Sequence, residues 1–94
     1  MTKYTVKYTT RFKKDYKLAQ RRHLNIQLLK DIISKLAMGE PLPPKNKDHA
    51  LSGDWTGHRE CHICPDWLLI YRIDGNSLVL TLTCTGTHSD LFGK

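Results

Sequence analysis

Three closely spaced prolines, Pro41, Pro43 and Pro44, separate a stretch with helical periodicity from a stretch with strand periodicity. Proline has no backbone N–H to donate and its ring fixes φ, so a helix cannot continue through this segment. Gly39 precedes the prolines and is typical of the position just beyond a helix C-terminus. The long helices should therefore lie before residue 40, and most of the strands should lie after it.

The first forty residues contain one strand pattern and two helix patterns. Residues 4–9 alternate and are rich in β-branched and aromatic side chains, which predicts an edge strand. Phe12, Tyr16 and Ala19 then recur at helical spacing, which predicts a first helix over residues 11–22 with one packed stripe and basic remaining faces.

A second and more apolar helix follows, with Asn25 as its expected cap. Its apolar side chains recur at steps of three and four residues, at Ile26, Leu29, Ile33 and Leu36. We expect it to be the core helix and to form an αα-hairpin with the first helix, laid over a sheet.

Beyond the prolines, β-type segments occupy residues 49–51, 57–64, 67–73 and 77–85, and Asp74-Gly75 between the last two is a strong hairpin signal. This order predicts an α+β fold, with two N-terminal helices packed on one face of a twisted, mainly antiparallel sheet of about four to five strands. A chain of 94 residues supports one core, so we expect residues 1–94 to form a single domain.

The charge is concentrated in the N-terminal part. Residues 1–35 carry ten Lys and Arg against Asp15 and Asp31, a net charge of +8, whereas residues 36–94 carry a net charge of −2. Such a patch fits a polyphosphate backbone, an acidic protein or anionic lipid, and a merely solvated basic helix face is an equal alternative.

Two further features bear on the compartment. No apolar run approaches the ~18 residues that span a membrane, and the N-terminus lacks the apolar core of a signal peptide, so we expect a cytoplasmic protein that does not enter membranes. The three cysteines are an odd number, which indicates reduced thiols.

Histidines gather on the strand expected over residues 57–64. Alternation places His58, Glu60, His62 and Cys64 on one face, which is too polar to lie under the helices. In the last strand, Leu78, Leu80, Leu82 and Cys84 are expected to face the helices and Val79, Thr81, Thr83 and Thr85 to face outward, which brings His88 to the rim of the same open face.

The histidines of this face suit proton transfer near neutral pH. His49, His62 and His88 together offer a base, an acid and a stabiliser of developing charge, although a single histidine is more often an ordinary surface residue. Trp67 is either a stacking platform for a base or an aromatic residue of the core, and Trp55 is better explained as a core residue.

Asp66, Phe92 and the cysteines each allow two interpretations. Asp66 can orient a histidine or pair with Arg59 or Arg72, and Phe92 can stack on a nucleotide or pin the tail. Cys61-His62-Ile63-Cys64, with Cys84 and His88, has spacings seen in zinc sites. Cys61 and Cys64 should, however, lie on opposite faces of a regular strand, so we expect no metal or other cofactor.

Three motifs identify a resemblance that covers nearly the whole chain. They are KDH at 47–49, PDWLLIY at 65–71 and GTHSDLF at 86–92. With them the chain resembles the YafQ-type toxins of the RelE superfamily. The resemblance implies a RelE-like fold and a type II toxin that acts as a ribosome-dependent mRNA endonuclease. Implied partners are mRNA, the rRNA of the 70S ribosome, and a cognate DinJ-like antitoxin in a heterotetramer.

The resemblance also implies roles for particular residues. His49 and His88 would be the acid and base in either order, His62 would stabilise charge, and Asp66 would assist. Glu60 stands where the family often has aspartate. Trp67, Phe92 and Arg59 would hold the nucleotide. Contacts with rRNA would come from the basic side chains of the first helix, namely Arg11, Lys13, Lys14, Lys17, Arg21 and Arg22.

The implied reaction is metal-independent cleavage in the ribosomal A site, in which a ribose 2′-hydroxyl attacks the adjacent phosphorus. Two alternatives remain at this stage. ParE-like relatives share the fold and inhibit DNA gyrase by binding, but they lack a histidine-rich face. A zinc-stabilised nucleic-acid-binding module is the other alternative.

Overall fold

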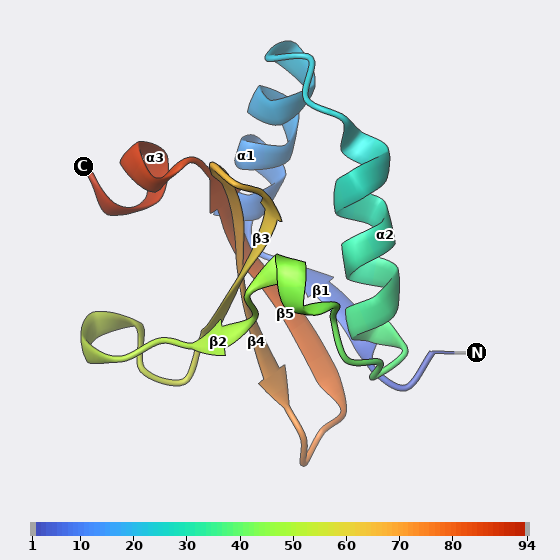
Figure 1. The fold of residues 1–94 in the computed structure, drawn as a ribbon. Coiled ribbons are helices and arrows are strands. Elements are labelled where there is room, and N and C mark those ends of the chain that lie inside the picture. The colour runs from blue at the N-terminus through green and yellow to red at the C-terminus, as the bar shows by residue number, and fades with distance from the viewer. Residues whose placement is uncertain (1, 94) are drawn as a thin grey trace.

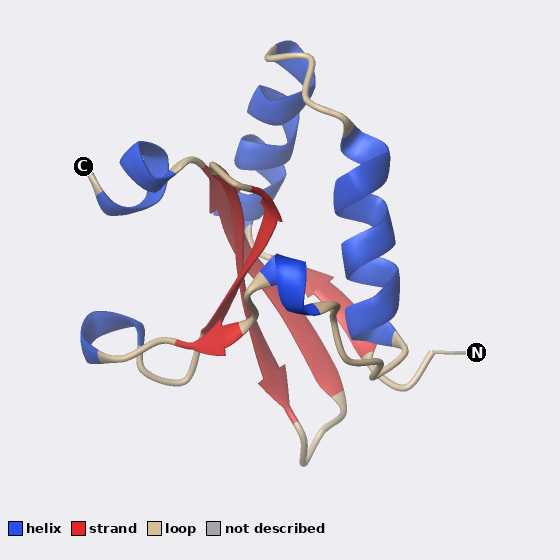
Figure 2. Ribbon diagram, viewed as in Figure 1, coloured by secondary structure: helices blue, strands red, loops and turns tan. Residues whose placement is uncertain are grey.

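The computed structural model describes residues 2–93, which form a five-stranded sheet in the order β1-β5-β4-β3-β2 (Figures 1 and 2). The β1–β5 pair is parallel and the other pairs are antiparallel, which confirms a mainly antiparallel sheet with the first strand at its edge. The strands are β1 (Thr5–Tyr8), β2 (His49–Ala50), β3 (Arg59–Cys64), β4 (Trp67–Asp74) and β5 (Val79–Gly86).

Three α-helices and two 3₁₀ turns complete the described chain. They are α1 (Thr10–Arg21), α2 (Ile26–Ala37), η1 (Pro44–Asn46), η2 (Gly53–Trp55) and α3 (His88–Phe92). None of the helices within residues 2–93 combines the length and the apolar character that crossing a bilayer requires.

Both long helices begin at side-chain caps. The Thr9 hydroxyl accepts a hydrogen bond from the Phe12 amide at 2.9 Å, and the Asn25 carbonyl oxygen accepts one from the Gln27 amide at 3.1 Å. Beyond α2, Gly39 has a φ of +76°, a conformation that a Cβ would strain, so the helix ends where the glycine and the prolines predict.

The main core lies between the helices and one face of the sheet. Phe12 and Ala19 of α1, and Leu29 of α2, pack with Leu80 and Leu82 of β5 in one cluster of buried side chains. Figure 1 shows α1 and α2 beside the same face of the sheet. The predicted two-layer arrangement is therefore confirmed.

The opposite face of the sheet is only partly open. Leu68, Ile70 and Cys84 form a second buried cluster there with Leu91 of α3, and Trp55 packs against its edge. The short α3 and η2 therefore cover part of the face that the sequence predicts to be exposed, and they frame the part that remains open.

The expected alternation of β5 is wrong at its C-terminal end. Tyr71 pairs with Leu82 while Ile70 pairs with Cys84, so a bulge at Thr83 reverses the side-chain alternation. Cys84 consequently faces away from α1 and α2, and Thr85 is buried beneath them.

Two other positions differ from the expected pattern. Leu78 lies in the β4–β5 turn with φ at +55°, and it is 47% exposed instead of facing the helices. The pairing of β3 with β4 is irregular between His62 and Cys64, and Cys64 packs against the same cluster as Cys61. The two thiols therefore do not lie on opposite faces as expected.

Candidate active site

The β3 strand carries the first pair of candidate residues. Glu60 and His62 lie two residues apart on one face, and His62 Nε2 is 3.5 Å from Glu60 Oε1. Glu60 is buried, with 5% of its surface exposed, whereas His62 is partly exposed. A buried carboxylate therefore lies behind an imidazole that solvent can reach.

The α3 helix adds the second histidine. His88 is its first residue, and the His62 and His88 ring centroids are 5.9 Å apart. Thr87 caps the helix through a capping box with Asp90, in which each side chain accepts a hydrogen bond from the other residue's amide. Two segments distant in sequence thus bring their imidazoles together, and His88 lies at the rim of this face as expected.

Asp66 and Phe92 lie on either side of His88. His88 Nδ1 is 3.4 Å from Asp66 Oδ1, and the His88 and Phe92 ring centroids are 6.3 Å apart. A carboxylate has no proton to donate at neutral pH, so this contact favours the tautomer with a proton on Nδ1. The Nε2 atom of His88 is then the nitrogen available to a substrate.

His49 reaches the same face from β2, where it lies directly opposite Glu60. Opposite residues on antiparallel strands share a face, so His49 lies beside Glu60 and His62. His49 Nδ1 is 2.8 Å from the Lys47 carbonyl oxygen, which can only accept. In neutral His49, the lone pair is therefore on Nε2. We call these residues, His49, Glu60, His62, Asp66 and His88, the histidine face.

A partly buried polar cluster supports the segment before His49. The Tyr71 hydroxyl donates to Asp48 Oδ1 at 2.5 Å, and Arg59 Nε donates to the same oxygen at 3.3 Å. Burial, followed by its hydrogen bond to Asp48, raises the pKa of Tyr71, so Tyr71 remains a donor. This cluster fixes the chain direction as it enters β2.

The structure does not bring Arg59 to the histidine face. Arg59 lies opposite Tyr71 in the β3–β4 ladder, on the face that the helices cover, and it is paired with Asp48. Strand alternation separates it from Glu60 and His62. Arg59 therefore supports β2, and nothing in its position favours the predicted nucleotide contact.

Trp67 is also removed from the open surface. It is 4% exposed within the main core, and its Nε1 donates to Thr85 Oγ1 at 3.0 Å. The Thr85 hydroxyl in turn donates to the Leu68 carbonyl oxygen at 2.6 Å. A nucleotide base has no access to the ring, so the core alternative for Trp67 fits and the stacking alternative does not.

Trp55 has the opposite outcome. It is partly exposed, and its ring lies 6.1 Å from that of Phe92 and 5.6 Å from that of His58, edge to face in both pairs. A hollow of about 660 Å³ opens here beside His88. Its lining residues are Asp54, Trp55, His88, Leu91 and Phe92. Trp55 also packs against the second buried cluster, so its predicted core role holds in part. No local pattern in the sequence marks Asp54, because its place beside Phe92 depends on contacts between distant segments.

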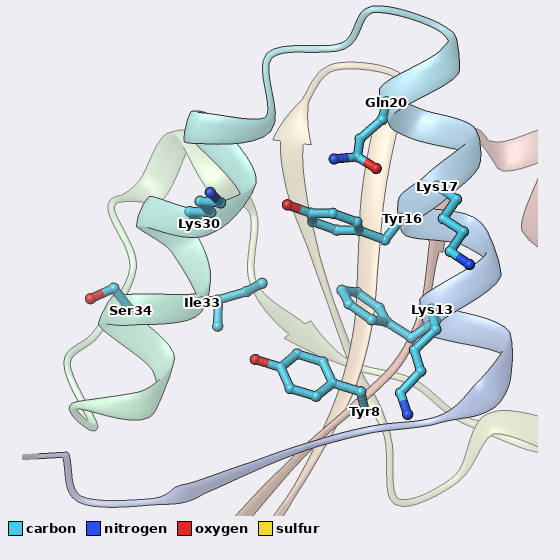
Figure 3. A pocket seen from close by; sticks show the side chains of 9 residues that line it. Tyr8, Lys13, Tyr16, Lys17, Gln20, Lys30, Ile33 and Ser34 are labelled. Carbon is cyan, nitrogen blue, oxygen red and sulfur yellow. The ribbon is translucent and has the colours of Figure 1, made fainter.

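A second hollow, of about 630 Å³, lies between α1, α2 and the end of β1. Figure 3 shows Tyr8 and Tyr16 directed into it, with Ile33 and Lys30 of α2 across from them. We call this the interhelical groove. Its lining residues are Tyr8, Phe12, Lys13, Tyr16, Lys17, Gln20, Lys30, Ile33 and Ser34.

The six basic residues predicted to hold rRNA are all exposed, but two of them have carboxylate partners. Arg11 Nε lies 3.8 Å from Asp15 Oδ2, and Arg22 Nη1 lies 2.7 Å from Asp90 Oδ2. The Arg22 hydrogen bond is the main reason that the pKa of Asp90 falls to about 2. Arg22 thereby ties α1 to α3 beside His88.

The cysteines are free thiols in this structure. Burial raises the pKa of Cys61 to about 12 and that of Cys84 to about 11, so both remain protonated at neutral pH. Across residues 2–93, no three His, Cys, Asp or Glu side chains are grouped so that they could hold a metal ion.

Comparison with known proteins gives one consistent result. The family model for a bacterial toxin of type II toxin-antitoxin systems, YafQ, matches residues 4–93. The mRNA interferase toxin YafQ of Escherichia coli strain K12 is 43% identical over 89 residues, which cover 94% of this chain and 95% of that protein.

Solved structures of relatives have the same fold. The crystal structure of YafQ from E. coli strain BL21(DE3) matches with a TM-score of 0.90 and 41% identity, over 96% of this chain and 99% of that one. The toxin chain of an E. coli DinJ-YafQ complex matches with a TM-score of 0.89 and 41% identity, over 97% and 99%. The predicted resemblance is confirmed: this chain belongs to the YafQ family of bacterial toxins of type II toxin-antitoxin systems.

Proposed function

We propose that this protein is an endoribonuclease toxin that cleaves mRNA in the ribosomal A site. One observation carries the proposal: His88 lies between His62, Asp66 and Phe92 on an open surface, with ring centroids 5.9 Å from His62 and 6.3 Å from Phe92. Grouped imidazoles and a carboxylate supply the two proton transfers that RNA cleavage needs. The names of the E. coli relatives support the same activity.

The hydrogen bonds suggest which histidine does what. His49 Nδ1 donates a hydrogen bond to the Lys47 carbonyl oxygen, so the lone pair on Nε2 is free to take the proton of the ribose 2′-hydroxyl. The 2′-oxygen then attacks the adjacent phosphorus, and the bond from phosphorus to the 5′-oxygen breaks. The products are a 2′,3′-cyclic phosphate and a free 5′-hydroxyl.

His88 is the proposed acid that protonates the departing 5′-oxygen. Asp66 lies beside its Nδ1, where a carboxylate holds the ring and is complementary to the positive imidazolium. His62, positioned by Glu60, would face the negative charge that develops on the phosphorane. The basic side chains of α1 without a carboxylate partner among residues 2–93 would hold rRNA through its phosphates. We expect such an enzyme to act in the cytoplasm, where the ribosomes are.

An antitoxin related to DinJ is the proposed inhibitor, since a relative 41% identical forms a DinJ-YafQ complex. We place an acidic, amphipathic segment of it in the interhelical groove. The groove has an aromatic floor for apolar side chains and a rim of Lys13, Lys17 and Lys30 for acidic ones. Light scattering of the complex would test the expected heterotetramer.

The direct test is mRNA cleavage in a purified translation reaction. Wild-type protein should cut mRNA when ribosomes are present and leave free RNA intact. His88→Ala should abolish the cuts, while His23→Asn, which changes an exposed histidine in the α1–α2 loop, should not. Growth arrest without mRNA cleavage would instead favour inhibition of DNA gyrase.

A further inference from the structure

We propose that the hollow between η2 and α3 is a nucleobase site, in which Trp55 and Phe92 hold the base that follows the cut and Asp54 discriminates against uracil. This assignment rests on the proposed function and deepens it. It concerns two residues, Trp55 and Asp54, outside the histidine face.

The position of the hollow follows from the chemistry of His88. His88 lines the hollow and is the proposed donor to the departing 5′-oxygen. That oxygen belongs to the nucleotide on the 3′ side of the cut, so this nucleotide must lie beside His88, with its base one ribose away. The hollow is the described depression that His88 shares with aromatic side chains.

Two aromatic rings make the hollow suitable for a base. Trp55 and Phe92 contact each other edge to face, at 80° between planes, and both line the hollow. Both side chains are partly exposed, and Leu91 below them is buried. Its volume of about 660 Å³ lies within the range of about 300 to 1,000 Å³ of small-ligand sites.

Asp54 gives the hollow its chemical preference. It is exposed at the rim, and among residues 2–93 no hydrogen bond or ion pair of its carboxylate is found. A carboxylate repels phosphate and accepts hydrogen bonds only, so it belongs beside a donor on a base edge. Adenine N6, cytosine N4 and guanine N2 are exocyclic amino donors, whereas uracil has only N3–H, which lies between two carbonyl oxygens that repel a carboxylate. Asp54 should therefore disfavour uracil.

The test uses reporter mRNAs that differ only in the nucleotide 3′ of one cut, translated with purified ribosomes. Trp55→Leu should lower kcat/KM by roughly 10- to 100-fold, and Trp55→Phe, which keeps a stacking ring, should restore most of it. Asp54→Asn can donate to the uracil carbonyl oxygens as well as accept, so it should lower the ratio of adenine, cytosine or guanine to uracil by about tenfold. Asp31→Asn, the same charge change on α2, should leave that ratio unchanged.

Thermal unfolding of each variant separates misfolding from lost recognition, and the base ratio is independent of the amount of active protein. If wild-type protein cleaves mRNA, and if Trp55→Leu leaves kcat/KM and Asp54→Asn leaves the base ratio unaltered, this assignment is overturned and the proposed function stands. Wild-type protein that cuts no mRNA would overturn both. A lower kcat/KM in Trp55→Leu together with a lower base ratio in Asp54→Asn would establish the site.

Discussion

The histidine face and the interhelical groove are built by different means, although both belong to one chain of 94 residues. The histidine face gathers polar residues from β2, β3, the β3–β4 turn and α3. Its two histidine–carboxylate distances are 3.4 and 3.5 Å, and the ring centroids of His62 and His88 are 5.9 Å apart. The groove is lined by aromatic rings of β1 and α1 and by lysines of both long helices. One surface depends on exact placement of a few groups, and the other offers apolar area with a charged rim.

This difference suggests a division of labour. Proton transfer requires heavy atoms within hydrogen-bond reach, so a small displacement at the histidine face is costly. Docking of a protein segment tolerates adjustment, because its free energy comes from buried area and a few aromatic anchors. Variants should therefore separate cleavage from inhibition, and they are described here from the largest expected effect to the smallest.

Removing either proposed proton-transfer group should have the largest effect. His49→Ala and His88→Ala should each lower kcat by roughly 10² to 10⁴-fold, with antitoxin affinity unchanged. Because a base works deprotonated, His49→Ala should remove the low-pH limb of the rate profile, and His88→Ala should remove the high-pH limb. Single-turnover cleavage across pH 5 to 9, roughly the range of histidine titration, checks this. If His49→Ala instead removed the high-pH limb and His88→Ala the low-pH limb, the two roles would be exchanged.

Truncating the groove aromatics should give the complementary result. Tyr8→Ala or Tyr16→Ala should weaken antitoxin binding by about 10- to 30-fold, since interface tyrosines are often worth about 2 kcal/mol. Tyr8 is 51% exposed, so its loss should hardly alter the free energy of unfolding. Calorimetric titration measures the affinity, with Leu28→Ala as an exposed apolar control on α2. Unchanged affinity in both tyrosine variants would mean that the antitoxin binds elsewhere.

Salt should act on association more than on dissociation. The net charge of +8 on residues 1–35 attracts an acidic segment at long range, and added salt screens that attraction. Raising NaCl from ~50 to ~500 mM should slow association about tenfold and change the dissociation rate much less. Biolayer interferometry gives both rates. A salt-independent association rate would contradict electrostatic steering of the antitoxin.

The link between α1 and α3 should give the smallest effect. The pKa of Asp90 is held at about 2 in the folded protein, mainly by Arg22, against 3.8 for the free side chain. The stabilisation is therefore fully present above pH ~4 and disappears as pH falls toward ~2. Asp90→Asn should lower the free energy of unfolding by about 0.5 kcal/mol at pH 7, since the pair is largely exposed.

The Asp90→Asn difference should vanish near pH 2, and urea unfolding at both pH values measures it. Arg21→Ala serves as a control, because Arg21 is exposed beside Arg22 and outside this ion pair. An equal loss of stability at both pH values would indicate that Asp90 acts through its capping of α3 and not through Arg22.

Sequence periodicity predicts the helices, the strands and much of the histidine face. Phe12, Tyr16 and Ala19 recur at a spacing that only one helix face can bury, and Thr9 and Asn25 supply hydrogen-bond acceptors where helices begin. The alternation of β3 likewise puts Glu60 and His62 together. These features could be predicted because each depends on neighbours within a few residues along the chain.

Local periodicity fails where pairing between strands intervenes. The bulge at Thr83 sends Cys84 and Thr85 to the faces opposite to those expected, and the irregular pairing beside Cys64 brings it to the cluster that holds Cys61. A bulge reverses every side chain beyond it, and its position depends on the partner strand. The sequence of one strand does not contain that information.

The amino-acid order alone thus determined where helices and strands form and which strand carries the grouped Glu60 and His62. Only the tertiary structure decided which aromatic is accessible: Trp67 is buried and hydrogen-bonded to Thr85 inside the core, whereas Trp55 is partly exposed beside Phe92 at the edge of the second cluster. The physical reason is that exposure results from packing between elements distant in sequence. In this protein, α3 and η2 meet across the second face of the sheet and leave a hollow next to His88.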